Sequence, residues 1–320
     1  MSATPLVSVV IPAYNCGAYL AAAVQSVLDQ DYPHKEVIVV NDGSTDNTAE
    51  VLAGFGTRIV VINQSNAGVA AARNLGMQTA HGELIALLDA DDLWLPGKLR
   101  KQVEYLNAHP ELGAVYCAWR EWAPNASGEF VIPQLSRDEM EREGIDAKDS
   151  GWLYNALLLD SIIHTTTLVI RREIMQQSGT FDAALRRGQD YDYWFRISRL
   201  APIHKLSAVL SLYRIHSESV SQKPHRANYP CLVIQKALDQ WGRVGPDGTE
   251  TSETIIKGVL SRRWFDFGYM HLLHGDPKLA YDAFVRSISL QPIRMKSWIN
   301  VARSLVKIVI KPKLPSVSGG

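Results

Sequence analysis

The sequence predicts an α/β protein with a mostly parallel central sheet and a small C-terminal α-helical region. Short apolar runs rich in β-branched residues alternate with stretches whose apolar residues recur at helical spacing, as is typical of parallel sheets. At 320 residues the chain exceeds what one hydrophobic core usually supports, so we expect two unequal parts. Hydrophobic residues make up 46% and charged residues 21%, a composition that excludes a disordered or fibrous protein.

Strands and helices alternate regularly up to residue 119. A buried strand at residues 7–11 ends at Pro12, and a helical pattern begins near Tyr19. Further strands are expected at residues 36–40, 59–62, 83–88 and 114–119, and further helices after Thr45, at residues 68–80 and after Pro96. Because ligands collect beyond the carboxyl ends of parallel strands, we expect the site at that edge.

The pattern is less regular after residue 119. Residues 123–150 predict a long loop containing a short helix. Strands are then expected at residues 165–170 and 209–214, and helices at residues 171–178 and 191–200. We place a domain boundary near residue 226, which gives a catalytic domain at residues 1–226 and a helical region at residues 227–320 with a disordered tail.

Charge and cysteine content exclude several classes of protein. Lys plus Arg and Asp plus Glu both number 33, so no overall field attracts nucleic acid. Cys16, Cys117 and Cys231 are widely spaced, which favours neither a disulfide framework nor a zinc site and fits a reducing cytoplasm. No signal peptide pattern and no run of 18 apolar residues is found, so we expect a cytoplasmic protein without a membrane-spanning helix.

Three carboxylates directly follow the predicted strand at residues 83–88. Asp89, Asp91 and Asp92 could hold a divalent cation through oxygen ligands, although a solvated turn explains such a cluster equally well when it is taken alone. Asp42 ends a neighbouring predicted strand at the same edge, where its carboxylate could accept hydrogen bonds from a base or ribose. The two motifs together favour a nucleotide and metal site over an ordinary turn.

Several segments in order resemble family 2 glycosyltransferases, whose nucleotide-sugar-binding fold is called GT-A. The resemblance covers roughly residues 5 to 222. It rests on Val9-Val10-Ile11-Pro12-Ala13-Tyr14-Asn15, Asn41-Asp42-Gly43-Ser44-Thr45-Asp46, Asn66-Ala67-Gly68 with Ala72-Arg73-Asn74, Gly82-Glu83 leading into Asp89-Ala90-Asp91-Asp92, and Gly179-Thr180-Phe181-Asp182 followed by Gln189-Asp190-Tyr191-Asp192-Tyr193-Trp194.

The resemblance implies a donor site for a nucleotide diphosphate sugar, with uridine diphosphate the expected carrier. Asp42 would read the base, Asp89 would touch the ribose region, and Arg73 would lie beside the phosphates. Asp91 would bind Mn²⁺ or Mg²⁺, which stabilises the leaving diphosphate. The full set of donor-binding candidates is Pro12, Ala13, Tyr14, Asn15, Asp42, Asn66, Gly68, Arg73, Asp89, Ala90 and Asp91.

The resemblance further implies that Asp190 is the catalytic base of an inverting transferase. The base would take the proton from a hydroxyl of the acceptor. By the same resemblance, the acceptor is a saccharide or a lipid-linked molecule. Asp190 could also be the N-cap of a helix, an interpretation that is compatible with the catalytic role. Many relatives have Glu before this Asp, whereas this chain has Gln189, which puts the acceptor contact of that Glu in doubt. His216 resembles a segment that closes over the diphosphate and is a second candidate metal ligand, although a histidine here is more often only hydrogen-bonded.

The C-terminal region offers two further contacts. Segments around Gly268 and Ala280 resemble one tetratricopeptide helix hairpin, which would pack on the rest of the chain, a partner or another copy in a homo-oligomer. Residues 301–314 mix apolar and basic residues and would suit peripheral attachment to the inner face of a membrane.

Three function classes remain open from the sequence. The first is a glycosyltransferase in bacterial polysaccharide or glycan biosynthesis, the second a nucleotidyltransferase of similar fold, and the third a non-catalytic nucleotide-binding scaffold. The retention of four acidic site candidates favours the first, and the missing early Gly-rich phosphate loop disfavours the second.

Overall fold

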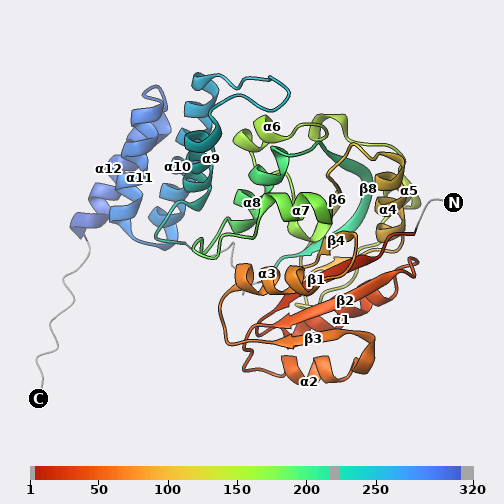
Figure 1. Cartoon of the computed structure of the whole chain (residues 1–320). Coiled ribbons are helices and arrows are strands. Elements are labelled where there is room, and N and C mark those ends of the chain that lie inside the picture. The colour runs from red at the N-terminus through yellow and green to blue at the C-terminus, as the bar shows by residue number, and fades with distance from the viewer. Residues whose placement is uncertain (1–3, 217–223, 311–320) are drawn as a thin grey trace, which may run out of the picture. The chain divides into compact units, whose positions relative to one another are not determined.

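The computed structural model describes residues 4–216 and 224–310 (Figure 1). The end of the His216 segment, at residues 217–221, and the expected tail lie outside the described residues. The described chain divides into two compact units. The first, called the catalytic unit below, comprises residues 4–216 with Val244–Thr249, and the second, the helical unit, comprises residues 224–243 and 250–310.

The catalytic unit is built on one sheet of eight strands in the order β3-β2-β1-β4-β7-β6-β8-β5. The pairs β3–β2, β2–β1, β1–β4 and β6–β8 are parallel, and the other neighbours are antiparallel. The strands are β1 (Val7–Ala13), β2 (Lys35–Asn41), β3 (Val60–Asn63), β4 (Leu84–Leu87), β5 (Leu93–Trp94), β6 (Ala114–Trp122), β7 (Val169–Arg171) and β8 (Ile203–Arg214). The α/β prediction is confirmed, and the four strands that carry the predicted site motifs are parallel.

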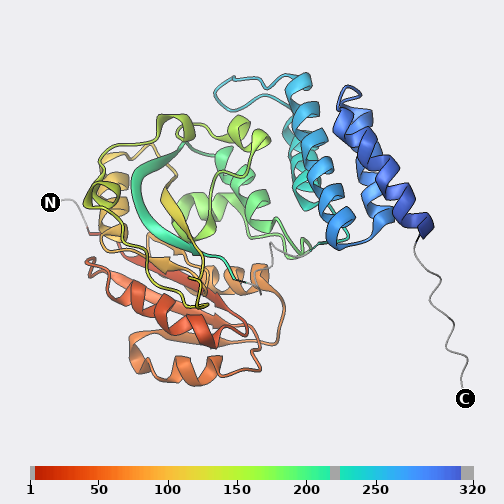
Figure 2. The same ribbon diagram turned by 180° about the vertical axis from the view of Figure 1, so that it is seen from behind.

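Helices cover both faces of this sheet (Figures 1 and 2). The helices of the catalytic unit are α1 (Gly17–Leu28), α2 (Thr48–Ala53), α3 (Val69–Thr79), α4 (Lys98–Ala108), α5 (Arg137–Glu141), α6 (Tyr154–Leu159), α7 (Arg172–Ser178) and α8 (Gln189–Ser198). Short 3₁₀ turns lie at Gly56–Arg58, Ala147–Asp149 and Thr165–Thr167. The predicted long loop at residues 123–150 contains α5, which begins with a capping box at Ser136.

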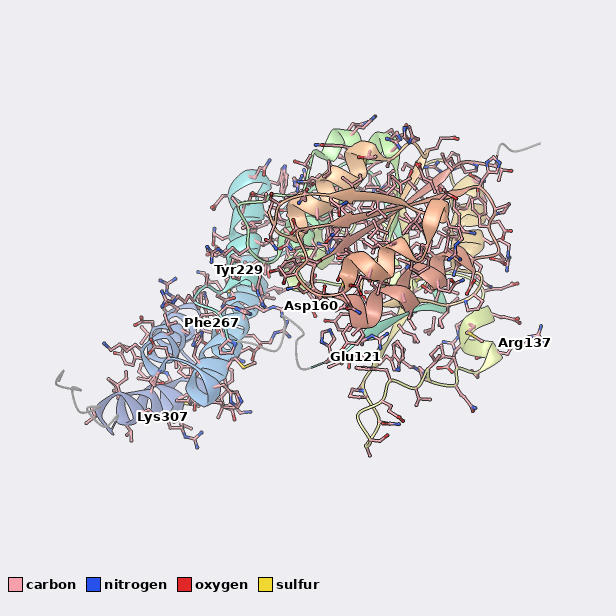
Figure 3. The ribbon with its side chains drawn as sticks, turned by 90° about the horizontal axis from the view of Figure 1, so that it is seen from below. Glu121, Arg137, Asp160, Tyr229, Phe267 and Lys307 are labelled. Atoms are coloured by element: carbon pink, nitrogen blue, oxygen red, sulfur yellow. The ribbon has the colours of Figure 1, made fainter. Side chains whose placement is uncertain are left out.

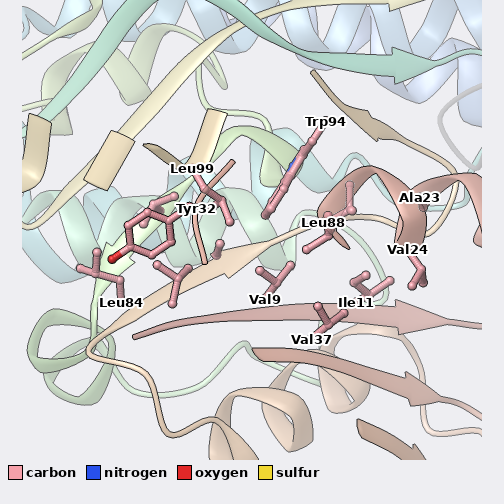
Figure 4. Close-up of a cluster of buried hydrophobic side chains, with 14 of the residues drawn as sticks. Val9, Ile11, Ala23, Val24, Tyr32, Val37, Leu84, Leu88, Trp94 and Leu99 are labelled. Carbon is pink, nitrogen blue, oxygen red and sulfur yellow. The ribbon is translucent and has the colours of Figure 1, made fainter. Parts of the chain in front are cut away.

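Alternating side chains of β1 face opposite layers. Val9 and Ile11 pack with Val24 of α1 and Leu99 of α4 in the main hydrophobic cluster (Figure 4). Val10 faces α3 on the other side, where a Cβ on Gly76 would lie 2.4 Å from its Cγ1. Gly76 therefore lets α3 approach the sheet closely enough to bring Arg73 near the strand ends.

One predicted strand differs in the structure. Residues 165–170 were expected to be extended throughout, but Thr165–Thr167 form a 3₁₀ turn and β7 begins at Val169. The Thr167 amide and hydroxyl both donate to the carbonyl of His164, which closes the turn. The strand prediction failed here because threonine, a good strand residue, can also satisfy such a turn with its own side chain.

The helical unit contains four helices that lie in a row (Figures 1 and 2). They are α9 (Tyr229–Trp241), α10 (Glu253–His274), α11 (Pro277–Leu290) and α12 (Met295–Ile310). Gly268 of α10 lies against Ala283 and Phe284 of α11, so the two helices form a close hairpin. Its likeness to a tetratricopeptide repeat stays a prediction. No helix within the described residues is long and apolar enough to cross a membrane.

Candidate active site

Three parallel strands of the catalytic unit end at one edge of the sheet. Ala13 at the end of β1 pairs with Asn41 at the end of β2, and the amide of Asp42 donates to the Ala13 carbonyl at 2.8 Å. β4 pairs in parallel with β1, so the loop at residues 89–92 leaves from the same edge. Both acidic motifs predicted from the sequence therefore lie at this edge, at the ends of the two strands that flank β1.

Asp42 organises the loop that leads into α3. Its carboxylate accepts hydrogen bonds from the side chain of Gln64 at 2.6 Å and from the amides of Ala67 and Gly68, both at 2.8 Å. Asp42 is 2% exposed, and Gly68, with φ of 90°, begins the helix. The structure thus gives Asp42 a role in holding this loop, while contact with a base stays a prediction.

The other donor-binding candidates of the first loops are divided between buried and exposed positions. Asn15 has a positive φ of 47°, and its side-chain oxygen accepts from the amide of Thr45 at 2.8 Å, which joins the first two loops. Pro12, Ala13 and Ala90 are buried, whereas Tyr14, Asn66 and Gly68 are exposed. The exposed ring of Tyr14 is therefore available at the edge where the nucleoside was predicted.

Arg73 lies at the centre of the acidic residues. Its guanidinium, from α3, pairs with Asp89 at 2.6 Å, and the side chain is 5% exposed. Burial disfavours the charge, but the nearby carboxylates of Asp89, Asp190 and Asp91 outweigh it and raise the pKa of Arg73. Within the described residues, Nε and Nη1 have no hydrogen-bond partner. A charged guanidinium with two buried N–H donors that lack partners among the described residues is suited to an anionic ligand.

Asp91 and His216 face each other across the site. The Nε2 atom of His216, which follows β8, lies 3.0 Å from Oδ2 of Asp91. Burial and the neighbouring Asp89 raise the pKa of Asp91, and the contact with His216 partly offsets this rise. The predicted pair of metal ligands is thus brought together from positions 125 residues apart in sequence.

The pair fits a divalent cation that draws its other ligands from outside the protein. A carboxylate oxygen and an imidazole nitrogen are both ligands for Mn²⁺. In residues 4–216 and 224–310, no group of three or more His, Cys, Asp or Glu side chains is arranged to hold a metal ion. Asp91 and His216 would supply two protein ligands, and water and phosphate oxygens could complete the coordination, as they commonly do for Mg²⁺.

Asp92 and Arg214 hold the acidic loop at residues 89–92 in place through hydrogen bonds. Asp92 is 1% exposed and accepts from the backbone amide of Arg214 at 2.9 Å and from the hydroxyl of Thr166. The Arg214 Nε donates to the carbonyl of Asp91 at 2.6 Å. Burial together with repulsion from Asp91 and Asp89 raises the pKa of Asp92 well above its usual range. Asp92 is thus a positioning residue for the loop.

Aromatic rings enclose the guanidinium of Arg214. Its Cζ lies 4.0 Å from the ring centre of Trp122, 4.5 Å from that of Phe130 and 4.6 Å from that of Tyr19. Phe130 belongs to the long predicted loop, so cation–π contacts attach this loop to the site. The sequence does not predict this role for Arg214, because nothing local to β8 reveals these rings.

The motif segment from Gly179 to Trp194, which contains Asp190, contacts α3. The side chain of Asn74 donates to the carbonyl of Phe181 at 2.9 Å and accepts from its amide at 2.8 Å. Asp190 lies in the first turn of α8, whose N-cap is Gly188, so the proposed capping role for Asp190 is wrong. Its carboxylate instead accepts from the amide of Tyr191 and contributes to the field at Arg73.

Gln189 and His164 flank the catalytic candidate. Gln189 is 7% exposed, and among the described residues its Oε1 has no hydrogen-bond partner. His164 lies between Trp119 and Tyr213, with ring centres 4.8 Å and 4.5 Å away. Burial lowers the pKa of His164, and the carboxylates of Asp89 and Asp190 only partly oppose this. A neutral imidazole between aromatic rings suits a sugar better than an anion.

A buried polar network below the site was missed from the sequence. Lys98 and Gln102 of α4 are both 0% exposed, and the ammonium of Lys98 donates to Gln102 at 2.6 Å above the ring of Trp94. Gln102 donates to the carbonyl of Thr167, and Trp94 to that of Thr166. The network thereby holds the turn that supports Asp92. Burial lowers the pKa of Lys98 to about 8.

Comparison with known proteins identifies the family. The model of glycosyl transferase family 2 matches residues 8–148. A glycosyltransferase of Bacillus subtilis assigned to teichuronic acid biosynthesis, TuaG, is 32% identical over 242 residues, which cover 74% of this chain and 89% of that protein. The chain belongs to glycosyltransferase family 2. A glycosyltransferase of Rickettsia felis is 34% identical over 240 residues, but the match spans only 37% of its length.

Solved structures show the same fold. TarS of S. aureus, residues 1–349 in complex with UDP-GlcNAc, aligns with a TM-score of 0.65 and 17% identity over 94% of this chain and 88% of that chain. A mannosyltransferase of Pyrobaculum calidifontis in complex with GDP-Man and Mn²⁺ aligns with a TM-score of 0.58 and 19% identity over 97% and 88%. The prediction of a GT-A glycosyltransferase is confirmed.

Proposed function

We propose that this family 2 glycosyltransferase moves a sugar from a UDP-sugar to a hydroxyl of a saccharide or lipid-linked acceptor, with inversion at the anomeric carbon. The observation that carries the proposal is the cluster around Arg73, where Asp89, Asp91 and Asp190 from two distant segments surround one buried guanidinium. The TarS complex with UDP-GlcNAc and the relation to TuaG support a nucleotide-sugar donor and a polysaccharide pathway.

The donor half of the site would bind the nucleotide diphosphate. Arg73 offers two buried donors to a phosphate while Asp89 holds the guanidinium in place. Asp91 and His216 would hold Mn²⁺ or Mg²⁺, which when bound neutralises the charge on the departing diphosphate. The Mn²⁺ complex of the mannosyltransferase supports this assignment. Asp42 would contribute to donor binding indirectly, by holding the loop at Ala67 and Gly68 in place.

The acceptor half would contain Asp190 as the catalytic base. The carboxylate would accept the proton of the acceptor hydroxyl as its oxygen attacks the anomeric carbon and the bond to the diphosphate breaks. Asp190 is one of the three carboxylates whose charge acts on Arg73, so the base candidate lies near the predicted phosphate site. Trp119, His164 and Tyr213 supply aromatic surface for a sugar ring close to this base.

Thermal unfolding with nucleotides tests the donor site without any acceptor. Ligands that bind only the folded state raise its melting temperature. We expect UDP with Mn²⁺ to raise it more than GDP, dTDP or CDP, and chelation of the metal or the change Asp91→Asn to remove the shift. Asp31→Asn is the matched control, because Asp31 is a half-exposed carboxylate paired with Arg100. The proposal fails if no nucleotide shifts the wild-type transition at millimolar concentration.

A further inference from the structure

Helix α12 of the helical unit exposes its apolar residues. Val309 is 81% exposed and Met295 68%, although large aliphatic side chains are usually buried. The exposed set on this helix is Met295, Trp298, Ile299, Leu305, Val306 and Val309. At 100° per residue, Trp298, Leu305 and Val309 form one row and Met295, Ile299 and Val306 an adjacent one. The apolar residues therefore form one continuous stripe.

The buried residues of α12 are polar, and the partly buried Val301 beside them packs against Leu272 and Phe284. Ser297, Asn300 and Ser304 are 0%, 4% and 0% exposed. The hydroxyl of Ser297 lies 2.9 Å from that of Ser287 on α11, and the Ser304 hydroxyl donates to the Asn300 carbonyl at 2.8 Å. Packing within the helical unit thus uses the small polar residues of α12 together with Val301, and it leaves the apolar stripe uncovered.

Basic residues border the stripe and acidic residues are missing. Lys296, Arg303 and Lys307 are spaced seven and four apart, so they form one exposed row next to Ile299 and Val306. Lys307, labelled in Figure 3, also donates to the carbonyl of Leu272 at 2.6 Å. Residues 283–320 contain seven Lys or Arg and no Asp or Glu.

We propose that the apolar stripe and basic row of α12 dock this protein on an anionic lipid membrane. An interfacial helix needs an apolar face that enters the acyl boundary, basic residues on its polar face, and often a tryptophan at the boundary. α12 presents all three, with Trp298 at the start of the stripe. The inference goes beyond the proposed function, because it does not depend on sugar transfer.

The charge pattern favours lipid over a second copy of the chain. Two copies that met through this face would bring basic rows together with no acidic residue between positions 283 and 320 to pair with them. An anionic membrane instead attracts each basic residue near its surface and accepts the apolar stripe at the same time. The long side chains of Lys296 and Arg303 can extend toward headgroups while their aliphatic parts stay near the stripe.

Vesicle binding of the full chain, without nucleotide, tests this proposal. We expect co-sedimentation with vesicles of equal parts phosphatidylglycerol and phosphatidylcholine, weak co-sedimentation with phosphatidylcholine alone, and a decrease with added salt. The double change Val306→Asp and Val309→Asp should lower binding to the anionic vesicles about tenfold or more, because it places charge in the stripe. Both side chains are exposed, so the melting temperature should not change.

Leu232→Asp is the matched control. Leu232 is a 50% exposed apolar residue on α9 of the same unit, and its replacement should leave vesicle binding intact. Equal binding by the double variant and the wild type would overturn the proposal. Absence of wild-type binding would also overturn it, and light scattering that showed an oligomer lost in the double variant would assign the face to a second copy. The UDP-induced shift should persist in the double variant, which separates this test from that of the donor site.

Discussion

The two units of the molecule depart from the usual distribution of residues in opposite ways. The catalytic unit buries charge, with Arg73, Asp92 and Lys98 at 4%, 1% and 0% exposed. The helical unit exposes apolar side chains and buries serines where α11 meets α12. Buried ions lower stability unless partners compensate, and exposed apolar stripes lose the benefit of burial. The burial of Arg73 and the exposure of the α12 stripe mark residues that we assign to binding rather than to stability.

The comparison also separates two kinds of buried charge in the catalytic unit. Arg73 has donors without partners among the described residues and lies among partly buried carboxylates. Lys98 is enclosed by Trp94 and Gln102 and only supports the turn below the site. We therefore expect changes at the first kind to alter ligand binding, and changes at the second to alter stability.

The largest effect is expected from Asp190→Asn. Without a base the transfer rate should fall about 10²- to 10⁴-fold, whereas the asparagine oxygen can still accept from the Tyr191 amide and keep the helix start intact. Steady-state transfer measured with the donor identified by the nucleotide screen checks this. An unchanged rate would remove Asp190 from the mechanism, and loss of the UDP-induced shift would give it a donor-binding role instead.

A smaller effect is expected from Arg73→Met. Loss of the charged donors should weaken UDP binding roughly 10- to 100-fold, since a hydrogen bond to a charged group contributes about 1.5 to 3 kcal/mol. Titration calorimetry measures the change, and Arg100→Met is the control because Arg100 is a half-exposed arginine paired with Asp31. Equal UDP affinity in the two variants would contradict the central position given to Arg73.

The smallest effect concerns Lys98 and pH. Burial lowers the pKa of Lys98 from 10.5 to about 8, so between these values the unfolded chain binds more protons than the folded one. Stability should therefore rise with pH in this window, by at most about 1.4 kcal/mol per pH unit. Lys98→Met should lose this rise, as measured by urea unfolding between pH 8 and 9.5. Parallel pH profiles for the two proteins would show that Lys98 stays charged.

Local patterns were sufficient to predict the parallel half of the sheet and the residues at its edge. Val7 to Ile11 and the acidic motifs are read from neighbours in sequence, because strand ends and turns depend on local chemistry. The contact of Asp91 with His216 was anticipated only through the family resemblance. The resemblance alone also suggested that Asp190 and Arg73 share one site.

The remaining features depend on contacts that local patterns do not contain. The ring contacts of Arg214 join three separate segments. The burial of Lys98 could not be predicted, because its position on the helix could equally face solvent. The turn at Thr165–Thr167 reads as a strand by composition. The composition of residues 301–314 suggested membrane contact, but it could not show that the apolar stripe of α12 is exposed, since such a stripe normally predicts the buried side of a helix.

Anomalous diffraction from crystals grown with UDP and Mn²⁺ tests the proposed donor and metal site. We expect a manganese peak within coordination distance of both the Asp91 carboxylate and the His216 imidazole, with the diphosphate against Arg73 and the Asp190 carboxylate free to face an acceptor. A nucleotide bound away from Arg73, or manganese held by other residues, would contradict this expectation.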